Sequence, residues 1–487
     1  MSLHQLYKPS LALLTDLYQL TMAYGYWKLG RHERESVFHL HVRKHPFDGG
    51  YMLAAGLSNA IDYLKQLKFD AEDIAYLTTL EGHDRTKLFD NGFLDWLGRM
   101  EFACDVDAVP EGTVVFANEP LVRVRGPLLQ AQLVETALLT ILNYETLIAS
   151  KASRVCYAAG GEPVLEFGLR RAQGVDGGIT ASRAAFIGGC EATSNVLAGR
   201  LYGIPVRGTH AHSWVMSYEN EAESLQAYAD VMPNNCVLLV DTYDTLRGVR
   251  LAAEVGQRLK KQGHKLLGVR LDSGDLAYLS IEARQILDEA GLHDAAVLGT
   301  NDLDENVIAS LKQQGAKINV WAVGTRLVTA QDQPALGGVY KLSAIRSRDG
   351  TWRYPLKASE TLAKASFPGI LQVRRYWRDS TMLADMIYHE PDGVPAHPQI
   401  EDPKDPTRHR NIDPATRHED LLVPVFRGGT CVYDLPALPA IQERAQQQLS
   451  SLHPTIRRLL NPHEYPAGLE RSLAERRAKL LMAVRPN

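Results

Sequence analysis

The sequence contains few cysteines, and their arrangement does not point to a disulfide framework or a thiolate metal site. Of its 487 residues only five are cysteines, and these are scattered along the chain (Cys104, Cys156, Cys190, Cys236 and Cys431). None of them forms a closely spaced pair of the kind found in zinc and redox motifs. Isolated cysteines are typical of free thiols in a reducing compartment, so we expect a cytoplasmic protein.

The sequence also lacks an excess of basic residues and any long apolar run. Its 53 lysines and arginines against 57 aspartates and glutamates give a formal net charge of −4, which does not favour a nucleic-acid or lipid-surface partner. No apolar segment is long enough to span a bilayer. The first twenty residues do not resemble a secretory signal, because Asp16 interrupts their apolar run and no basic start precedes it.

The first 135 residues mix helix and strand patterns, which predicts an N-terminal α+β domain. Apolar residues near the helical period predict helices, and alternation of apolar and polar residues predicts strands. The pattern predicts helices at 15–30, 54–67 and 91–100, a strand at 35–44 and a β-rich stretch at 106–127.

Residues 136–375 show a different pattern, in which short apolar runs alternate with helical segments. The expected strands lie within 163–169, 203–209, 236–242, 265–275, 295–302 and 318–325. The expected helices lie at 182–202, 245–263 and 275–291. This alternation predicts a parallel sheet, either open or closed into a barrel.

Polar residues or glycine lie at or just past the ends of almost all of these expected strands. They are Glu166, Arg170, Thr209, His212, Asp241, Arg270, Asp272, Asn301, Gly324 and Thr325. In a (β/α) barrel the carboxyl ends of the strands meet at one mouth, and active sites form there. We therefore expect these residues to surround a single site.

The stretch "VRLDSGDL" carries the chemistry best suited to a phosphorylated sugar. Arg270 offers a planar fork of donors for phosphate. Asp272 and Asp275 suit ribose hydroxyls or Mg²⁺, and the Ser273–Gly274 pair permits close approach of a ligand to the backbone. The alternative is a strand end followed by an ordinary helix cap.

Two further stretches suit anionic groups. In "VWAVGTRL", Gly324 and Thr325 follow a late strand and can form an anion-binding turn of backbone N–H groups. In "EFGLRRAQG", Arg170 and Arg171 suit a carboxylate or a phosphate, although a solvated basic turn would look the same. Neither stretch is decisive alone.

The stretch "GTHAHSWV" places His210 and His212 two residues apart. A zinc site would need further ligands, and no HExxH motif or cysteine cluster supplies them. The ordinary alternative for either histidine is a buried structural residue. The phosphate-suited groups nearby favour another interpretation, in which a histidine attacks a phosphoryl group and carries it covalently.

The last part of the chain, residues 376–487, reads as a C-terminal extension. Proline and charged residues are frequent between 380 and 420, which predicts loops or an extended connection. Two amphipathic surface helices are expected at 435–452 and 468–484. No internal repeat or low-complexity tract is present.

Several motifs, taken in order, resemble the nicotinate phosphoribosyltransferase family over nearly the whole chain. They are "LLTDLYQLTMAYGYW", "EFGLRRAQG", "GTHAHSWV", "VRLDSGDL", "TNDLDE", "VWAVGTRL", "LGGVYKL" and "PVFRGGTCVYDLPAL". The resemblance implies the α/β fold of type II phosphoribosyltransferases, an irregular (β/α) barrel with an N-terminal α+β domain and a C-terminal extension. It also implies a homodimer with shared active sites.

The resemblance further implies the substrates nicotinate and phosphoribosyl pyrophosphate, Mg²⁺, and coupling to ATP hydrolysis through a phosphohistidine. By motif position the phosphohistidine is His212 and not His210. Nicotinate contacts correspond to Tyr18 and Thr209, and phosphoribosyl pyrophosphate contacts to Arg270 and Thr325.

Chemistry at the predicted mouth suggests the remaining roles. We expect Arg171 to bind the nicotinate carboxylate, and Asp272 to hold the ribose or, with Asp275, Mg²⁺. The other expected substrate-binding residues are Ser273, Gly274, Asn301 and Gly324. The alternatives are a nicotinamide phosphoribosyltransferase, which has the same fold, and a non-catalytic barrel that binds a phosphosugar.

Overall fold

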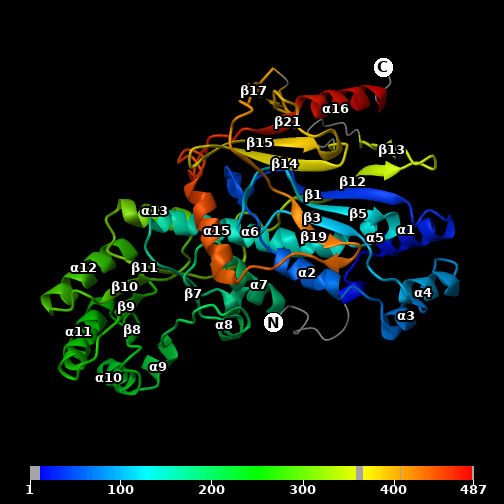
Figure 1. Ribbon diagram of the computed structural model, residues 1–487. Helices are drawn as coiled ribbons and strands as arrows, with labels where there is room; N and C mark the ends of the chain where they lie inside the picture. The colour runs from blue at the N-terminus through cyan, green and yellow to red at the C-terminus, as the bar shows by residue number, and fades with distance from the viewer. Residues whose placement is uncertain (1–10, 358–365, 406, 485–487) are drawn as a thin grey trace. The chain divides into compact units, whose positions relative to one another are not determined.

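The computed structural model describes residues 11–357, 366–405 and 407–484. The first ten residues, which belong to the stretch tested for a secretory signal, lie outside these ranges. The chain forms two compact units (Figure 1). We call Lys151–Pro334 the central unit, and Met1–Ser150 together with Ala335–Asn487 the terminal unit. Within the described ranges, no helix is long and apolar enough to cross a membrane.

A curled sheet of six parallel strands forms the centre of the central unit, in the order β7-β6-β11-β10-β9-β8. The strands are β6 (Val164–Glu166), β7 (Ala192–Thr193), β8 (Val237–Leu239), β9 (Gly268–Leu271), β10 (Ala296–Gly299) and β11 (Val320–Val323). Five of them fall within predicted strand segments, and their apolar side chains are almost wholly buried. Parallel strands covered by helices read as continuous apolar runs, which is why the sequence reveals them.

Helices follow the strands, as the alternating pattern predicts. They are α7 (Gly174–Ile187), α8 (Val196–Tyr202), α9 (His212–Met216), α10 (Glu221–Val231), α11 (Thr245–Lys261), α12 (Leu276–Glu289), α13 (Glu305–Gln313) and α14 (Thr325–Val328). Aspartate side chains cap α11, α12 and α13 by accepting backbone N–H groups in the first turn. These caps lie directly after the strand ends, so each strand leads tightly into its helix.

Two expectations for this unit are wrong. The single helix expected at 182–202 is divided into α7, β7 and α8, because Gly189 adopts a φ of 112°, which a helix does not accommodate. The strand expected at 203–209 is reduced to one bridging residue, Val206, which pairs with Thr193. Here the apolar run is too short to form a regular strand.

The terminal unit contains a seven-stranded antiparallel sheet in the order β13-β12-β1-β5-β3-β19-β20. Its strands are β1 (Glu35–Val42), β3 (Asp105–Ala108), β5 (Pro120–Pro127), β12 (Gly338–Arg346), β13 (Trp352–Arg353), β19 (Val423–Arg427) and β20 (Thr430–Cys431). A two-stranded sheet of β2 (Met52–Leu53) and β4 (Val114–Val115) also belongs to this unit. The strands therefore come from both ends of the chain.

The terminal unit has helices in the five segments predicted for it, 15–30, 54–67, 91–100, 435–452 and 468–484, and also at 71–77 and 128–133, where the sequence pattern does not predict them. They include α1 (Leu17–Lys28), α2 (Leu57–Lys65), α3 (Ala71–Leu77), α4 (Asn91–Gly98), α5 (Leu128–Leu133), α15 (Leu438–Ser450) and α16 (Arg471–Val484). A long helix, α6 (Glu135–Ala159), begins in the terminal unit and ends in the central unit.

The expectation of loops or an extended connection at 380–420 is wrong in part, because a second six-stranded sheet includes four segments of this stretch. Its order is β17-β16-β21-β15-β14-β18. The strands are β14 (Leu371–Arg378), β15 (Thr381–His389), β16 (Gln399–Glu401), β17 (His409–Asn411), β18 (His418–Asp420) and β21 (Ala467–Glu470). Three of these strands have only three residues each, too few for an alternating pattern to emerge from the sequence.

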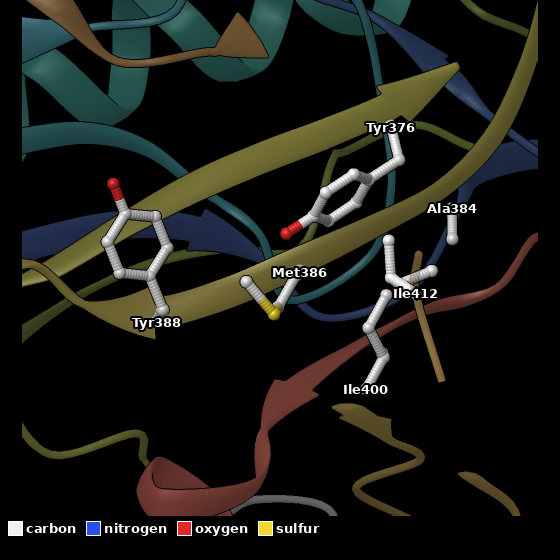
Figure 2. Packing of buried hydrophobic residues seen from close by; sticks show 6 residues of the cluster. All are labelled: Tyr376, Ala384, Met386, Tyr388, Ile400 and Ile412. Carbon is white, nitrogen blue, oxygen red and sulfur yellow. The ribbon is translucent and has the colours of Figure 1, made fainter. Parts of the chain in front are cut away.

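Strand β15 is buried on both faces, which also explains why alternation fails to reveal it. On one face Ala384, Met386 and Tyr388 join a buried cluster with Tyr376, Ile400 and Ile412 (Figure 2). On the other face the fully buried side chains of Arg375 and Asp385 form an ion pair. Such a pair is tolerated in a core only when its hydrogen bonds are satisfied, and Arg375 also donates to the Val114 carbonyl at 2.8 Å.

Candidate active site

A cavity of about 390 Å³ lies at the carboxyl ends of the central unit's strands. This is the edge of the sheet where the predicted residues were expected to meet. Of the residues named in the sequence, His212, Asp241, Ser273, Gly274 and Asp275 are not among those that line it, and the ones that do are Arg170, Arg171, Thr209, His210, Arg270, Asp272, Asn301, Gly324 and Thr325. They come from loops after different strands, so the structure brings together residues separated by more than 150 positions in the sequence.

The Asp272 carboxylate is the centre of the polar contacts at this cavity. Its Oδ1 lies 3.2 Å from Arg270 Nη2 and accepts the hydroxyl of Thr300. Burial by itself would raise the pKa of Asp272, but the Thr300 hydrogen bond and the Arg270 charge lower it below the ordinary value. Asp272 is therefore an anion at neutral pH, and it holds Arg270 in place.

His212 occupies the first position of α9, beside this pair. Its Nδ1 lies 3.1 Å from Thr242 Oγ1, and its Nε2 lies 3.6 Å from Asp272 Oδ2. The imidazole is thus placed between the loops that follow β8 and β9. With 39% of its side chain exposed, it remains accessible to a ligand.

A second carboxylate, Asp241, fixes the loop that carries Asp272. Its Oδ2 accepts the backbone N–H of Asp272 at 2.8 Å and the hydroxyl of Ser273 at 2.6 Å. Asp241 is itself buried at the end of β8. Ser273 therefore uses its hydroxyl to fix the loop, and Gly274, at φ 79°, allows the loop to turn into α12.

Arg171 and Thr325, from the loops after β6 and β11, meet at the same cavity. Arg171 Nη1 donates to Thr325 Oγ1 at 3.3 Å. Gly324 leaves room for this approach, because a Cβ atom there would lie 3.1 Å from the Phe167 carbonyl oxygen, which is tighter than most Cβ contacts. Close approach of the loops after β6 and β11 brings the guanidinium and the start of α14 to the same place.

Asn301 follows β10 in a left-handed conformation, with φ 83°. The same turn continues through Asp302, at φ 43°, and both residues line the cavity. Asparagine and aspartate tolerate this region better than most residues. The turn therefore presents two polar side chains to the cavity wall.

Two residues named at the strand ends have structural roles. Glu166 is buried and accepts hydroxyl groups from Ser182 at 2.8 Å and Thr193 at 2.6 Å. Thr209 lines the cavity, but its hydroxyl donates to the carbonyl oxygen of Val237. Both side chains hold the ends of the sheet together.

The donors present suit Mg²⁺ only in part. Asp275 Oδ1 accepts the Tyr278 N–H at 3.1 Å as the cap of α12, which is the helix-cap alternative for this stretch. Asp272 can supply one carboxylate oxygen, and Mg²⁺ commonly takes one or two carboxylates together with substrate phosphates and water. Among the described residues, no group of three or more histidine, cysteine or acidic side chains is arranged to hold a metal ion.

Tyr18 lies on α1 in the terminal unit, with 49% of the residue exposed.

Sequence reasoning missed Thr242 and Thr300, whose hydroxyl groups contact His212 and Asp272. Each directly adjoins a residue that the sequence did single out, Asp241 or Asn301. The position of each threonine next to a polar residue at a strand end was the signal in the sequence that could have identified it.

Comparison with known proteins agrees with this geometry. Family profiles for the nicotinate phosphoribosyltransferase N-terminal domain, the nicotinate phosphoribosyltransferase family and its C-terminal domain match residues 13–143, 164–299 and 372–477. The chain is 43% identical over 475 residues to nicotinate phosphoribosyltransferase of Bacillus subtilis, covering 94% of this chain and 93% of that one.

Solved structures show the same fold. Human nicotinic acid phosphoribosyltransferase superimposes with a TM-score of 0.82 at 32% identity, covering 96% of this chain and 99% of that one. Nicotinate-nucleotide pyrophosphorylase of Pyrococcus furiosus has a TM-score of 0.66 at 20% identity, covering 91% and 96%, and supports the fold alone. The predicted fold class is confirmed, and the chain belongs to the nicotinate phosphoribosyltransferase family.

Proposed function

We propose that this protein transfers the phosphoribosyl group of phosphoribosyl pyrophosphate to nicotinate, forming nicotinate mononucleotide and pyrophosphate in NAD salvage. The transfer is coupled to ATP hydrolysis through phosphorylation of His212. The observation that carries the proposal is the 3.6 Å approach of His212 Nε2 to Asp272 Oδ2, because Asp272 and its partner Arg270 line the cavity. This group combines a phosphate-binding fork, an anion and a nucleophile.

In the transfer step, the main tasks of the protein are to position the two substrates and to neutralise the negative charge of the pyrophosphate. The pyridine nitrogen attacks C1′ of the ribose as the bond to pyrophosphate breaks, so positive charge develops on the sugar and negative charge on the leaving group. Arg270 binds the pyrophosphate end, and its pairing with Asp272 holds the guanidinium in one orientation before substrate arrives. Mg²⁺, held by Asp272 and the substrate phosphates, would supply further positive charge to the leaving group.

The part of the cavity lined by Arg171 and Thr325 suits the second substrate, nicotinate. Arg171 offers a planar fork to the nicotinate carboxylate, and its hydrogen bond to Thr325 orients it. Nicotinamide carries an uncharged carboxamide in place of that carboxylate, so a cationic wall favours nicotinate. The start of α14 at Thr325 and the preceding Gly324 provide backbone N–H groups for a phosphate oxygen.

His212 acts as the nucleophile toward ATP. When Nδ1 carries the proton and donates to Thr242 Oγ1, the lone pair of Nε2 is free to attack the γ-phosphorus. The new N–P bond forms as the bond between the γ-phosphorus and the bridging oxygen of ADP breaks. Water later attacks the phosphohistidine and releases inorganic phosphate.

The active unit is a homodimer in the cytoplasm. Helix α1 exposes Leu17, Tyr18 and Met22, with exposed fractions of 53%, 49% and 39%. Exposed apolar side chains that lie together on a helix commonly mark a contact surface. In the proposed dimer, Tyr18 stacks on the pyridine ring in the site of the partner subunit.

Replacement of Arg270 by lysine should weaken binding of the sugar substrate selectively. Lysine keeps the charge but loses the planar fork that grips the pyrophosphate. We expect the apparent KM for phosphoribosyl pyrophosphate to rise roughly tenfold or more, with a much smaller change for nicotinate. Steady-state kinetics measure both constants. Arg284→Lys on α12 is the control, and an equal rise for both substrates in Arg270→Lys would indicate a structural role.

Sharing of sites between subunits can be tested with mixed dimers. Tyr18→Ala and His212→Ala homodimers should each lose nearly all ATP-coupled activity. Dimers formed from one chain of each kind should recover one intact site of two, so purified mixed dimers should reach about half of the wild-type rate and an equal, fully exchanged mixture about a quarter. Failure to recover activity, after subunit exchange has been demonstrated, would count against a shared site.

Phosphorylation of His212 can be detected directly. Incubation with γ-labelled ATP should give a label that is labile in acid and stable in base, as expected for a phosphoramidate. His212→Ala should carry none, whereas His293→Ala, at an exposed histidine outside the site, should be labelled as the wild type is. Persistence of the label in His212→Ala would place the phosphohistidine elsewhere.

A further inference from the structure

The segment 205–210 spans the two open edges of the central sheet. The sheet ends at β7 on one side and at β8 on the other. Beside β7 the contact is ordinary backbone pairing, since Thr193 N donates to the Pro205 carbonyl and Arg207 N donates to the Thr193 carbonyl, both at 3.0 Å. The segment therefore continues the sheet for one residue beyond β7.

Beside β8, the segment 205–210 makes its hydrogen bonds to the strand edge through side chains and not through its backbone. The Val240 N–H points inward and donates to the Arg270 carbonyl at 3.3 Å, so the neighbouring Leu239 N–H points to the open edge. That N–H donates to His210 Nε2 at 3.2 Å. The Thr209 hydroxyl donates to the Val237 carbonyl, one pleat earlier on the same edge. Two consecutive side chains thus satisfy an acceptor and a donor of a strand edge.

The environment of His210 suits it to accept a hydrogen bond. The side chain is buried, and its ring lies 4.6 Å from the ring of Tyr228. Burial lowers the pKa of His210 to about 4, and the positive charge of Arg270 acts in the same direction. The ring is therefore neutral at pH 7. Its Nδ1 lies 3.4 Å from the Ala211 carbonyl oxygen and carries the proton, which leaves Nε2 as the acceptor.

We propose that His210 is a positioning residue that anchors the segment 205–210 to the edge of β8 and thereby holds His212 between Thr242 and Asp272. Only Ala211 separates the anchor from the nucleophile, so release of the anchor lets the start of α9 move. An apolar side chain of similar size would fill the space but leave the buried Leu239 N–H without an acceptor, which is unfavourable. The consequence for catalysis rests on the proposed role of His212.

The test compares His210→Leu with His210→Gln. Leucine fills the volume without an acceptor, whereas the glutamine amide oxygen reaches about as far as Nε2. We expect the Leu239 amide of His210→Leu to exchange with solvent at least about tenfold faster, and phosphorylation by γ-labelled ATP to slow by about ten- to a hundredfold. Diethyl pyrocarbonate should also modify His212 faster. His210→Gln should lie near the wild type in all three measurements.

Thermal unfolding of both variants sets a temperature at which each is folded, so that the comparison concerns the anchor alone. The proposal is overturned if the two variants behave alike, or if Leu239 exchange rises in His210→Leu while modification of His212 stays unchanged. Absence of label on the wild type would contradict the phosphohistidine. Amide exchange and diethyl pyrocarbonate modification would still decide whether His210 positions His212.

Discussion

The carboxylate of Asp272 is the contact on which the candidate active site depends. It receives a hydrogen bond from Thr300 at the end of β10, holds Arg270 of β9, and faces His212 after the segment that crosses to β8. Three loops are thereby joined through one anion. Because burial opposes its charge and Arg270 with Thr300 favours it, the carboxylate is most stable when all these partners are in place.

Buried carboxylates at the same edge of the sheet hold the neighbouring loops and elements in place. Asp241 accepts the backbone N–H of Asp272 and so orients the loop that carries it. Glu166 performs the corresponding task on the other side of the sheet by accepting hydroxyl groups from Ser182 and Thr193. Glu166 also accepts the backbone N–H of Gly168, so both carboxylates act on loops that contain cavity-lining residues and orient these loops.

The sequence predicts the site better than it predicts the elements around it. Convergence of Arg270, Asp272 and Thr325 follows from parallel strands whose carboxyl ends share one edge, and the structure places all three on the same cavity. The sequence could not separate ligand from cap at Asp275, because the same carboxylate chemistry serves both. Strand β7 has two residues and interrupts a segment with helical character, so its existence depends on the turn at Gly189 and on pairing with β6. Such pairing depends on the tertiary structure, so the local sequence pattern could not reveal β7.

The central claim, that this cavity selects nicotinate for phosphoribosyl transfer, is tested most directly by pyrophosphate release with each pyridine. The purified protein is supplied with phosphoribosyl pyrophosphate, Mg²⁺ and ATP, and with either nicotinate or nicotinamide. We expect release to require nicotinate and to be at least about a hundredfold less efficient, in kcat/KM, with nicotinamide, because only nicotinate brings a carboxylate to Arg171. Equal or greater efficiency with nicotinamide would contradict it.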